Sequence, residues 1–257
     1  MVPRPHPSPD WEPRTSSSAP GPGEVHIWRW QLDQRRTNVD SLCDYLDNVE
    51  LGRAERFHCC RNRERFIVAH GMLRVILGGY LDMPPSHLHF VCGYFGKPEL
   101  DPQRSSNGLS FNLSHAGGLA LLAVTAGARV GVDLELVRRD IPCEEIADQF
   151  FSPCEIASLR ALPPEMRSEA FFHGWTRKEA YVKARGQGLS YPLDRFTVSL
   201  DPANAELLDT ADDPEDRERW FIHSPASGTE YVAALVVEQP VSVVLHWDAQ
   251  QHIVTPR

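Results

Sequence analysis

Three features that assign a chain to a broad class at once are missing from this sequence of 257 residues. Its longest apolar run, around 119–126, is far shorter than the roughly 20 residues that a membrane-spanning helix needs. An excess of basic residues is also missing: the formal net charge is −9, which argues against a general nucleic-acid-binding surface. The N-terminus lacks the apolar core of a signal peptide. We therefore expect no membrane partner and no nucleic-acid partner.

The six cysteines lack the spacing of a zinc site or of a disulfide framework. No C-x-x-C pair occurs, and Cys59 and Cys60 are adjacent, which suits neither a mutual disulfide nor a metal-binding knuckle. Reduced thiols are typical of proteins that stay in a reducing compartment. We therefore expect a cytoplasmic protein whose cysteines are structural.

The order of periodic segments predicts two similar halves after a short tail. Residues 1–23 contain seven prolines and four serines, too little apolar surface to offset the entropy of ordering, so we expect a disordered tail. Strand-like and helical segments occur in both 24–127 and 128–257, with a long helix expected near 63–82 and again near 165–184. The prediction is an α+β fold of two pseudo-symmetric lobes, each a small, mostly antiparallel sheet packed with a long helix.

Two carboxylates, Asp133 and Glu135, stand two residues apart on a predicted strand that is otherwise apolar. Because side chains alternate across a strand, both carboxylates point to one face. Like charges side by side are unfavourable unless a cation lies between them, and Mg²⁺ prefers carboxylate oxygens together with phosphates and water. The other interpretation is a strand edge with two solvated acids, and the pair alone leaves both open.

The segment 174–190, GWTRKEAYVKARGQGLS, begins as a helix and ends on two glycines, which is typical of a helix stop. Within the helix, Trp175, Glu179 and Lys183 recur at steps of four and share one stripe. A surface ion pair between Glu179 and Lys183, worth about 0.3 kcal/mol, would explain two of them. A binding site for a cation and an anion, one helical turn apart, would explain the same spacing.

Five motifs in their order along the chain resemble the 4′-phosphopantetheinyl transferases. They are FGKP at 95–98, FNLSH at 111–115, GVDLE at 131–135, FFSPCE at 150–155 and W-T-R-K-E-A-x-x-K-x-x-G-x-G-L at 175–189. The last string is the most specific, whereas D-x-E alone would be weak. The match runs from about residue 24 to 247, and the two lobes resemble the larger, Sfp-type branch rather than the short trimeric holo-carrier-protein synthases.

The resemblance implies both a reaction and a metal site. Members of the family move the 4′-phosphopantetheine group of coenzyme A to a serine of a carrier protein domain and release adenosine 3′,5′-bisphosphate. The metal is Mg²⁺ held by three acids, here Asp133, Glu135 and Glu179, in the C-terminal lobe. Lys183, one turn beyond Glu179, is expected to face the phosphates, so both residues take part in catalysis. Trp175 is expected to be a packing anchor of the helix.

By the same resemblance, the first lobe supplies most contacts to coenzyme A. Lys97 and His115 match family positions near the nucleotide, where the histidine meets the 3′-phosphate; a histidine after a strand otherwise has a structural role. Ser114 is expected as a weaker contact, and Arg65 as a basic residue at the nucleotide end. From the second lobe, Lys178 is expected to touch either the phosphate or the carrier.

Glu155 has two interpretations. By resemblance it is the catalytic acid often proposed as the base that deprotonates the carrier serine or a bridging water. By position it is a first-turn acid of a helix capped by Ser152, where the helix dipole favours a negative charge. A water held near the metal would give the same base catalysis without Glu155.

Two other functions would use the same residues. Another Mg²⁺-dependent phosphoryl-transfer enzyme would need no carrier protein, and a non-catalytic relative would only bind coenzyme A or a carrier. The second is expected to have lost one of the three acids, and all three are present. The predicted partners are apo acyl or peptidyl carrier domains and coenzyme A. The protein is expected to be a monomer, because both lobes lie in one chain.

Overall fold

We describe the protein from a computed structural model, in which the described residues are Trp11, 18–93, 95–103, 108–213, 215–238 and 241–250. The expected tail, residues 1–23, lies mostly outside this part of the chain. Across the described ranges, no helix is at once long enough and apolar enough to cross a membrane.

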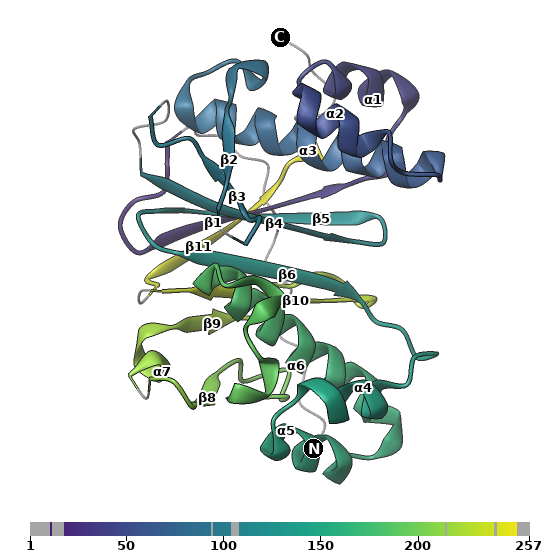
Figure 1. Cartoon of the computed structure of the whole chain (residues 1–257), viewed down its shortest axis with the longest axis vertical. Helices are drawn as coiled ribbons and strands as arrows, with labels where there is room; N and C mark the ends of the chain where they lie inside the picture. Colours follow the sequence, from purple (N-terminus) through teal and green to yellow (C-terminus); the bar gives the residue numbers. More distant parts are fainter. Residues whose placement is uncertain are drawn as a thin grey trace.

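The first lobe consists of one sheet with helices on its outer face. Its elements are β1 (Glu24–Gln31), α1 (Arg36–Cys43), α2 (Asn48–Ala54), α3 (Cys60–Leu81), β4 (Leu109–Ala116), β5 (Leu119–Ala126) and, from the far end of the chain, β11 (Val243–Asp248). The strand order is β11-β1-β5-β4; the pairs β1–β5 and β4–β5 are antiparallel, and β11 joins β1 in parallel. The three helices lie above this sheet in Figure 1.

The central strands of this sheet are apolar on both faces because each face meets another layer. In β1, Val25 and Ile27 belong to the core between the two sheets, whereas Trp28 and Trp30 belong to the core beneath the helices. This alternation follows from the period of two in a strand. Both tryptophans are among the largest fully buried side chains of the protein.

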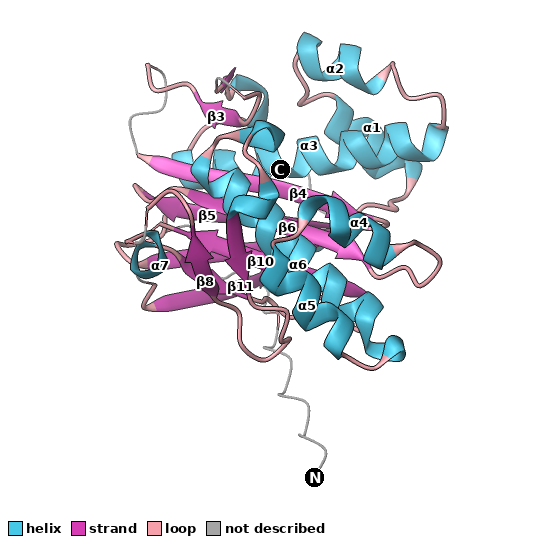
Figure 2. Cartoon of the chain, turned by 60° about the horizontal axis from the view of Figure 1, so that its bottom comes forward, coloured by secondary structure: helices cyan, strands magenta, loops and turns pink. Residues whose placement is uncertain are grey.

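The second lobe repeats the plan with a smaller sheet. Its main elements are β6 (Val130–Leu136), α4 (Cys143–Phe150), α5 (Pro153–Ala161), α6 (Pro164–Arg185), β9 (Phe221–His223) and β10 (Tyr231–Val237). The strands are antiparallel in the order β6-β10-β9. Figures 1 and 2 both show α4, α5 and α6 together on the side of the molecule away from α1–α3.

The two sheets pack face to face, so the layers run helix, sheet, sheet, helix (Figure 1). Val132 and Leu134 of β6 and Leu235 of β10 share one buried cluster with Leu121 of β5. Apolar burial of this kind stabilises the fold by roughly 25 cal/mol per Å² of surface removed from water. The seam between the lobes is therefore a hydrophobic core along most of its length.

Short elements complete the described part of the chain. They are η1 (Pro85–His87), β2 (Phe90–Cys92), β3 (Pro98–Leu100), η2 (Gly188–Ser190), η3 (Leu193–Arg195), β7 (Phe196–Val198), β8 (Leu207–Thr210) and α7 (Asp216–Arg219). Of these, β2 pairs with β3 and β7 pairs with β8, each in antiparallel register.

The predicted architecture of two α+β lobes, each with a long helix, is confirmed. The long helices expected near 63–82 and 165–184 are α3 and α6, and both begin and end within three residues of the expected positions. One strand crosses the boundary between the two expected lobes. β11 lies in the second half of the sequence but pairs with β1 in the sheet of the first lobe.

Candidate active site

The acids of β6 face α6 because of the alternation in the strand. Val132 and Leu134 occupy the core between the sheets, so Asp133 and Glu135 lie on the opposite face. Gly131 shares that face and lets α6 approach closely: a Cβ there would lie 2.0 Å from the carbonyl oxygen of Ala180. The close approach brings the middle of α6 beside the two acids.

The predicted stripe of α6 lines a cavity of about 750 Å³ that also contains these acids. The helix ends where Gly186 adopts a left-handed conformation with φ 70°, as expected for a C-terminal glycine. Three further segments line the cavity: β4, the end of α4 and residues 191–194. The whole lining set is Ser114, His115, Asp133, Leu134, Glu135, Gln149, Phe150, Trp175, Glu179, Lys183, Tyr191, Pro192, Leu193 and Asp194. The sequence thus predicted most of the polar residues of one cavity.

The pKa values of Glu135 and Glu179 are raised, in part by the negative charges of neighbouring acids. Burial raises the pKa of Glu135 to about 7, and the negative charges of Asp133 and Glu179 add to the rise. The pKa of Glu179 is also raised, first by burial and then by the charge of Asp133. Such shifts indicate negative charge held together in a partly enclosed space, a setting that a cation stabilises.

Lys183 is one cation that balances the negative charge of these acids. Its Nζ lies 2.6 Å from Oδ1 of Asp133 and 3.2 Å from Oγ of Ser114. Ser114 in turn donates to the same Oδ1 at 3.0 Å. The other oxygen of Asp133, Oδ2, is buried and has no hydrogen-bond partner among the described residues. One carboxylate oxygen is therefore occupied by the lysine and the second is unsatisfied.

These residues fit a hard divalent cation. The donors are carboxylate oxygens, and a buried carboxylate oxygen without a partner is costly unless something binds it. Within the described residues, no three His, Cys, Asp or Glu side chains are arranged as a ready metal-binding group. Lys183 Nζ lies 2.6 Å from Asp133 Oδ1, so its ammonium group occupies an oxygen that a metal ion would use.

His115 lies at the exposed rim of the cavity, next to Ser114 on β4. Its pKa is lowered, first by partial enclosure and then by the positive neighbours His70, Lys183 and Arg65. Positive groups therefore gather at this end of the cavity, which suits an anionic ligand.

Lys97 and Arg65 lie outside the residues that line the cavity. Lys97 donates to the carbonyl oxygens of Val130, at 2.7 Å, and Lys183, at 3.0 Å, and so links the first lobe to β6 and α6. Burial lowers the pKa of Lys97 to about 8. Arg65 makes two hydrogen bonds of 2.8 Å to Asp33. The structure thus gives Lys97 a role at the seam and pairs Arg65 with an acid.

Glu155 and Lys178 are not brought to the cavity. They form a buried ion pair of 2.8 Å, with 1% and 0% of their side chains exposed. The structure confirms the helix-cap interpretation of Glu155, because its backbone N–H donates to Ser152 Oγ and its carboxylate accepts from Ser152 N. Lys178 does not reach the space where phosphate would bind, since adjacent helix residues point about 100° apart and Glu179 takes that direction.

The apolar wall of the cavity was not among the expected site features. Phe150, Tyr191 and Leu193 line the cavity, and Phe150 is 41% exposed and packs edge-on against Trp175. Phe150 opens the FFSPCE motif, which was the available signal. Nothing in the sequence around 191–194 marks these residues as part of a site.

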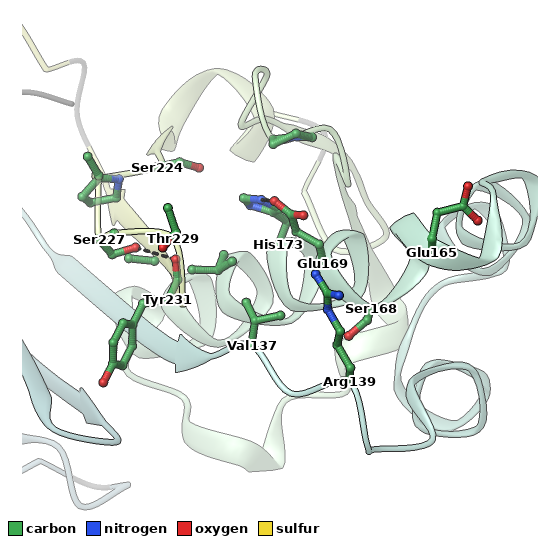
Figure 3. Close-up of a pocket in the computed structure, with 16 residues that line it drawn as sticks. Val137, Arg139, Glu165, Ser168, Glu169, His173, Ser224, Ser227, Thr229 and Tyr231 are labelled. Carbon is green, nitrogen blue, oxygen red and sulfur yellow. Dashed lines mark hydrogen bonds and ion pairs between the residues drawn. The ribbon is translucent and has the colours of Figure 1, made fainter. Parts of the chain in front are cut away.

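A second cavity, of about 490 Å³, holds none of the predicted site residues. Figure 3 shows His173 and Glu169 of α6 facing the loop that carries Ser224, Ser227 and Thr229. Burial lowers the pKa of His173 to about 4, and its Nδ1 has no partner among the described residues. This cavity combines acids, a neutral histidine and hydroxyls, without an arrangement that defines a reaction.

Comparison with known proteins identifies the chain. Residues 29–127 match the family described as "4'-phosphopantetheinyl transferase, N-terminal", and residues 129–236 match the "4'-phosphopantetheinyl transferase superfamily". The chain is 41% identical over 201 residues to the 4′-phosphopantetheinyl transferase HetI of Nostoc, covering 78% of this chain and 84% of that protein. The chain belongs to the 4′-phosphopantetheinyl transferases.

Two further relatives agree with this assignment. The 4′-phosphopantetheinyl transferase Sfp of Bacillus subtilis is 30% identical over 63% of this chain and 69% of its own length. The human L-aminoadipate-semialdehyde dehydrogenase-phosphopantetheinyl transferase is 25% identical over 74% of this chain and 66% of its own length. The protein is therefore an Sfp-type enzyme that transfers the 4′-phosphopantetheine group of coenzyme A to carrier proteins. Enzymes of this family generally use Mg²⁺.

Proposed function

We propose that Asp133, Glu135 and Glu179 hold the Mg²⁺ ion of this transferase. The observation that carries the proposal is that one cavity is lined by all three acids, while a buried oxygen of Asp133 has no partner among the described residues. Mg²⁺ bound there would neutralise the pyrophosphate of coenzyme A and polarise the phosphorus under attack. The acids come from β6 and α6, whose close packing at Gly131 fixes their separation.

The phosphates of coenzyme A are proposed to lie against Lys183, Ser114 and His115. These side chains line the same cavity as the acids and come from both lobes, so the substrate would bind across the seam. Lys183 would turn from Asp133 to the phosphates, a short movement for a flexible side chain with three donors. Arg65 is proposed for the nucleotide end, because its charge lies near enough to His115 to affect the pKa of that residue.

In the transfer step, the Oγ of the carrier serine forms a bond to phosphorus, and the bond from that phosphorus to the departing adenosine 3′,5′-bisphosphate breaks. The serine proton needs a base. Glu155 is enclosed by Lys178 and two backbone N–H groups, so the base is proposed to be a water held among the carboxylates of the cavity.

Several properties of the whole protein are proposed alongside these roles. A division into lobes at 24–127 and 128–257 is supported by the turn between β5 and β6 and by the limits of the two family matches. A cytoplasmic location is supported by cysteines that are all free thiols. A monomer is supported by the contribution of both lobes of one chain to the cavity. The broad acceptance of the two-lobed type favours carriers of polyketide and non-ribosomal peptide synthases.

A mass measurement tests the metal site. The protein is mixed with coenzyme A, Mg²⁺ and an apo carrier domain, and the carrier is weighed by mass spectrometry. We expect a gain of one phosphopantetheine group with the wild type, and no gain after chelation by EDTA or with Asp133→Ala. Transfer that persists in Asp133→Ala would contradict the assignment of this acid.

A further inference from the structure

Glu155 and Lys178 form a buried ion pair next to the residues that line the cavity. Removing two charges from water is costly, and hydrogen bonds must compensate on every side. Here they do: Lys178 Nζ has three oxygen acceptors, and its charge lies 4.2 Å from the centre of the Phe196 ring. Burial raises the pKa of Glu155 and lowers that of Lys178, and each charge opposes the shift of the other.

One partner of Lys178, Leu193, lines the cavity, and another, Phe196, lies three residues further along the chain. Lys178 Nζ donates to the carbonyl oxygen of Leu193 at 2.7 Å and to that of Phe196 at 2.6 Å. Leu193 and its neighbour Asp194 line the same cavity as the acids. Lys178 is also the residue directly before Glu179 on α6. It therefore ties the strip 191–196 to the helix that carries one of the three acids.

Glu155 completes the connection from the other side. One carboxylate oxygen accepts from Val198 N at 2.7 Å, 43 residues along the chain, and the other accepts from Ser152 N at 2.7 Å. Ser152 follows Gln149 and Phe150, which line the same wall. A further hydrogen bond, from Thr197 Oγ1 to Ser152 Oγ at 2.8 Å, joins the two segments directly.

We propose that Glu155 and Lys178 are positioning residues, which clamp the wall formed by Gln149–Phe150 and 191–194 to α6 at the spacing from the acids that transfer requires. The inference rests on the proposed metal site in the same cavity. It assigns Glu155 no part in proton transfer, because the two bonds from backbone N–H groups and the ion pair with Lys178 keep its carboxylate away from the cavity.

The test compares Glu155→Gln, Lys178→Met and the double variant carrying both. Each single change leaves one buried charge without its partner, and a displacement of about 1 Å in the wall lowers kcat/KM for the carrier by about 100-fold. The double variant is neutral but lacks the hydrogen bonds from Lys178 to Leu193 and Phe196. We therefore expect its kcat/KM to recover only in part, to within about tenfold of the wild type. A general base could not be restored in this way, so a double variant as inactive as Glu155→Gln would overturn the proposal.

The pH dependence gives a second readout that does not require the double variant to fold. If Glu155 positions the wall, Glu155→Gln lowers the rate by the same factor at every pH, and the profile keeps its shape. If Glu155 is the base, the acid limb of the kcat/KM profile disappears, which contradicts the inference.

Arg177→Met is the matched control. Arg177 is the preceding residue on α6, is equally buried, and donates to the carbonyl oxygens of Ser199 and Asp201, neither of which lines the catalytic cavity. We expect this variant to lose stability while keeping the KM for the carrier of the wild type. Absence of transfer by the wild type would instead refute the proposed function, so the two failures are distinguishable.

Discussion

At the scale of single residues, the site is a balance of charge between three acids and one lysine. Lys183 reaches Asp133 Oδ1 at 2.6 Å and is the cation nearest to that oxygen among the described residues. In the proposed metal site, the ion and this ammonium group would compete for the same carboxylate. In the proposed complex, the phosphates of coenzyme A would offer the lysine another anion and free this carboxylate oxygen for the metal ion.

Replacement of Lys183 by Met should therefore separate metal binding from substrate binding. A charge-assisted hydrogen bond is worth roughly 1.5 kcal/mol, or about tenfold in affinity. We expect Lys183→Met to bind Mn²⁺ about tenfold more tightly than the wild type in the absence of coenzyme A, by electron paramagnetic resonance titration. Its affinity for coenzyme A should fall by a similar factor. Unchanged Mn²⁺ affinity would show that the lysine does not compete.

The residue scale also shows where sequence reasoning succeeds and where it stops. Spacing placed Glu179 and Lys183 on one stripe of a helix, and the cavity confirms that they share a face. The spacing does not reveal what packs against the other faces of the helix. Lys178 was therefore expected near the phosphate or the carrier, whereas the structure buries it against Leu193 and Phe196. Long-range partners of this kind depend on tertiary contacts that one sequence does not display.

At the scale of elements, the site depends on the contact between β6 and α6. A Cβ on Gly131 would lie 2.0 Å from Ala180 O and 2.5 Å from Ala184 N, which are backbone atoms that cannot turn aside. Only a glycine allows the strand that carries Asp133 to lie this close to the helix. The period-two pattern predicted the strand, but the motif did not reveal that its glycine is a packing requirement.

Replacement of Gly131 by Ala should push α6 from the sheet. Overpacking of a buried contact costs up to about 3 kcal/mol, so we expect the free energy of unfolding in urea to fall by about that amount and Mn²⁺ affinity to fall with it. Gly52→Ala in α2 is the control, because no atom lies within 4 Å of the added Cβ. That variant should be neutral or gain up to about 1 kcal/mol. Equal behaviour of the two variants would contradict the packing argument.

At the scale of the whole molecule, the lobes are joined by more than the hydrophobic seam. β11 carries the end of the described chain back to β1, and His246 of β11 lies with its ring 6.0 Å from that of His223 in the other sheet. Burial lowers the pKa of His246 to about 4, with further effects of the positive neighbours His223 and Arg29. This return of the chain could not be predicted, because strand order depends on which edges remain available after the rest has folded.

Protonation of His246 at acid pH should lower the free energy of unfolding of the protein. The pKa of His246 is lower in the folded state than the usual 6.5, so the unfolded chain binds the proton more readily, and stability is lost as pH falls from about 6.5 to 4. We expect the loss to be about 2 kcal/mol smaller in His246→Phe over this window, by urea denaturation. His58→Phe, at an exposed position, is the control. Parallel losses in the wild type and His246→Phe would contradict the argument.

The convergence of Asp133, Glu135 and Glu179 on one divalent ion is tested most directly by a crystal structure with Mn²⁺ and coenzyme A. The anomalous signal of manganese locates the ion independently of the protein atoms. We expect one peak about 2.1 Å from a carboxylate oxygen of each acid, with Lys183 turned toward the phosphates. A peak bound elsewhere, or one that leaves any of the three acids without a contact to the ion or to its bound waters, would contradict the account.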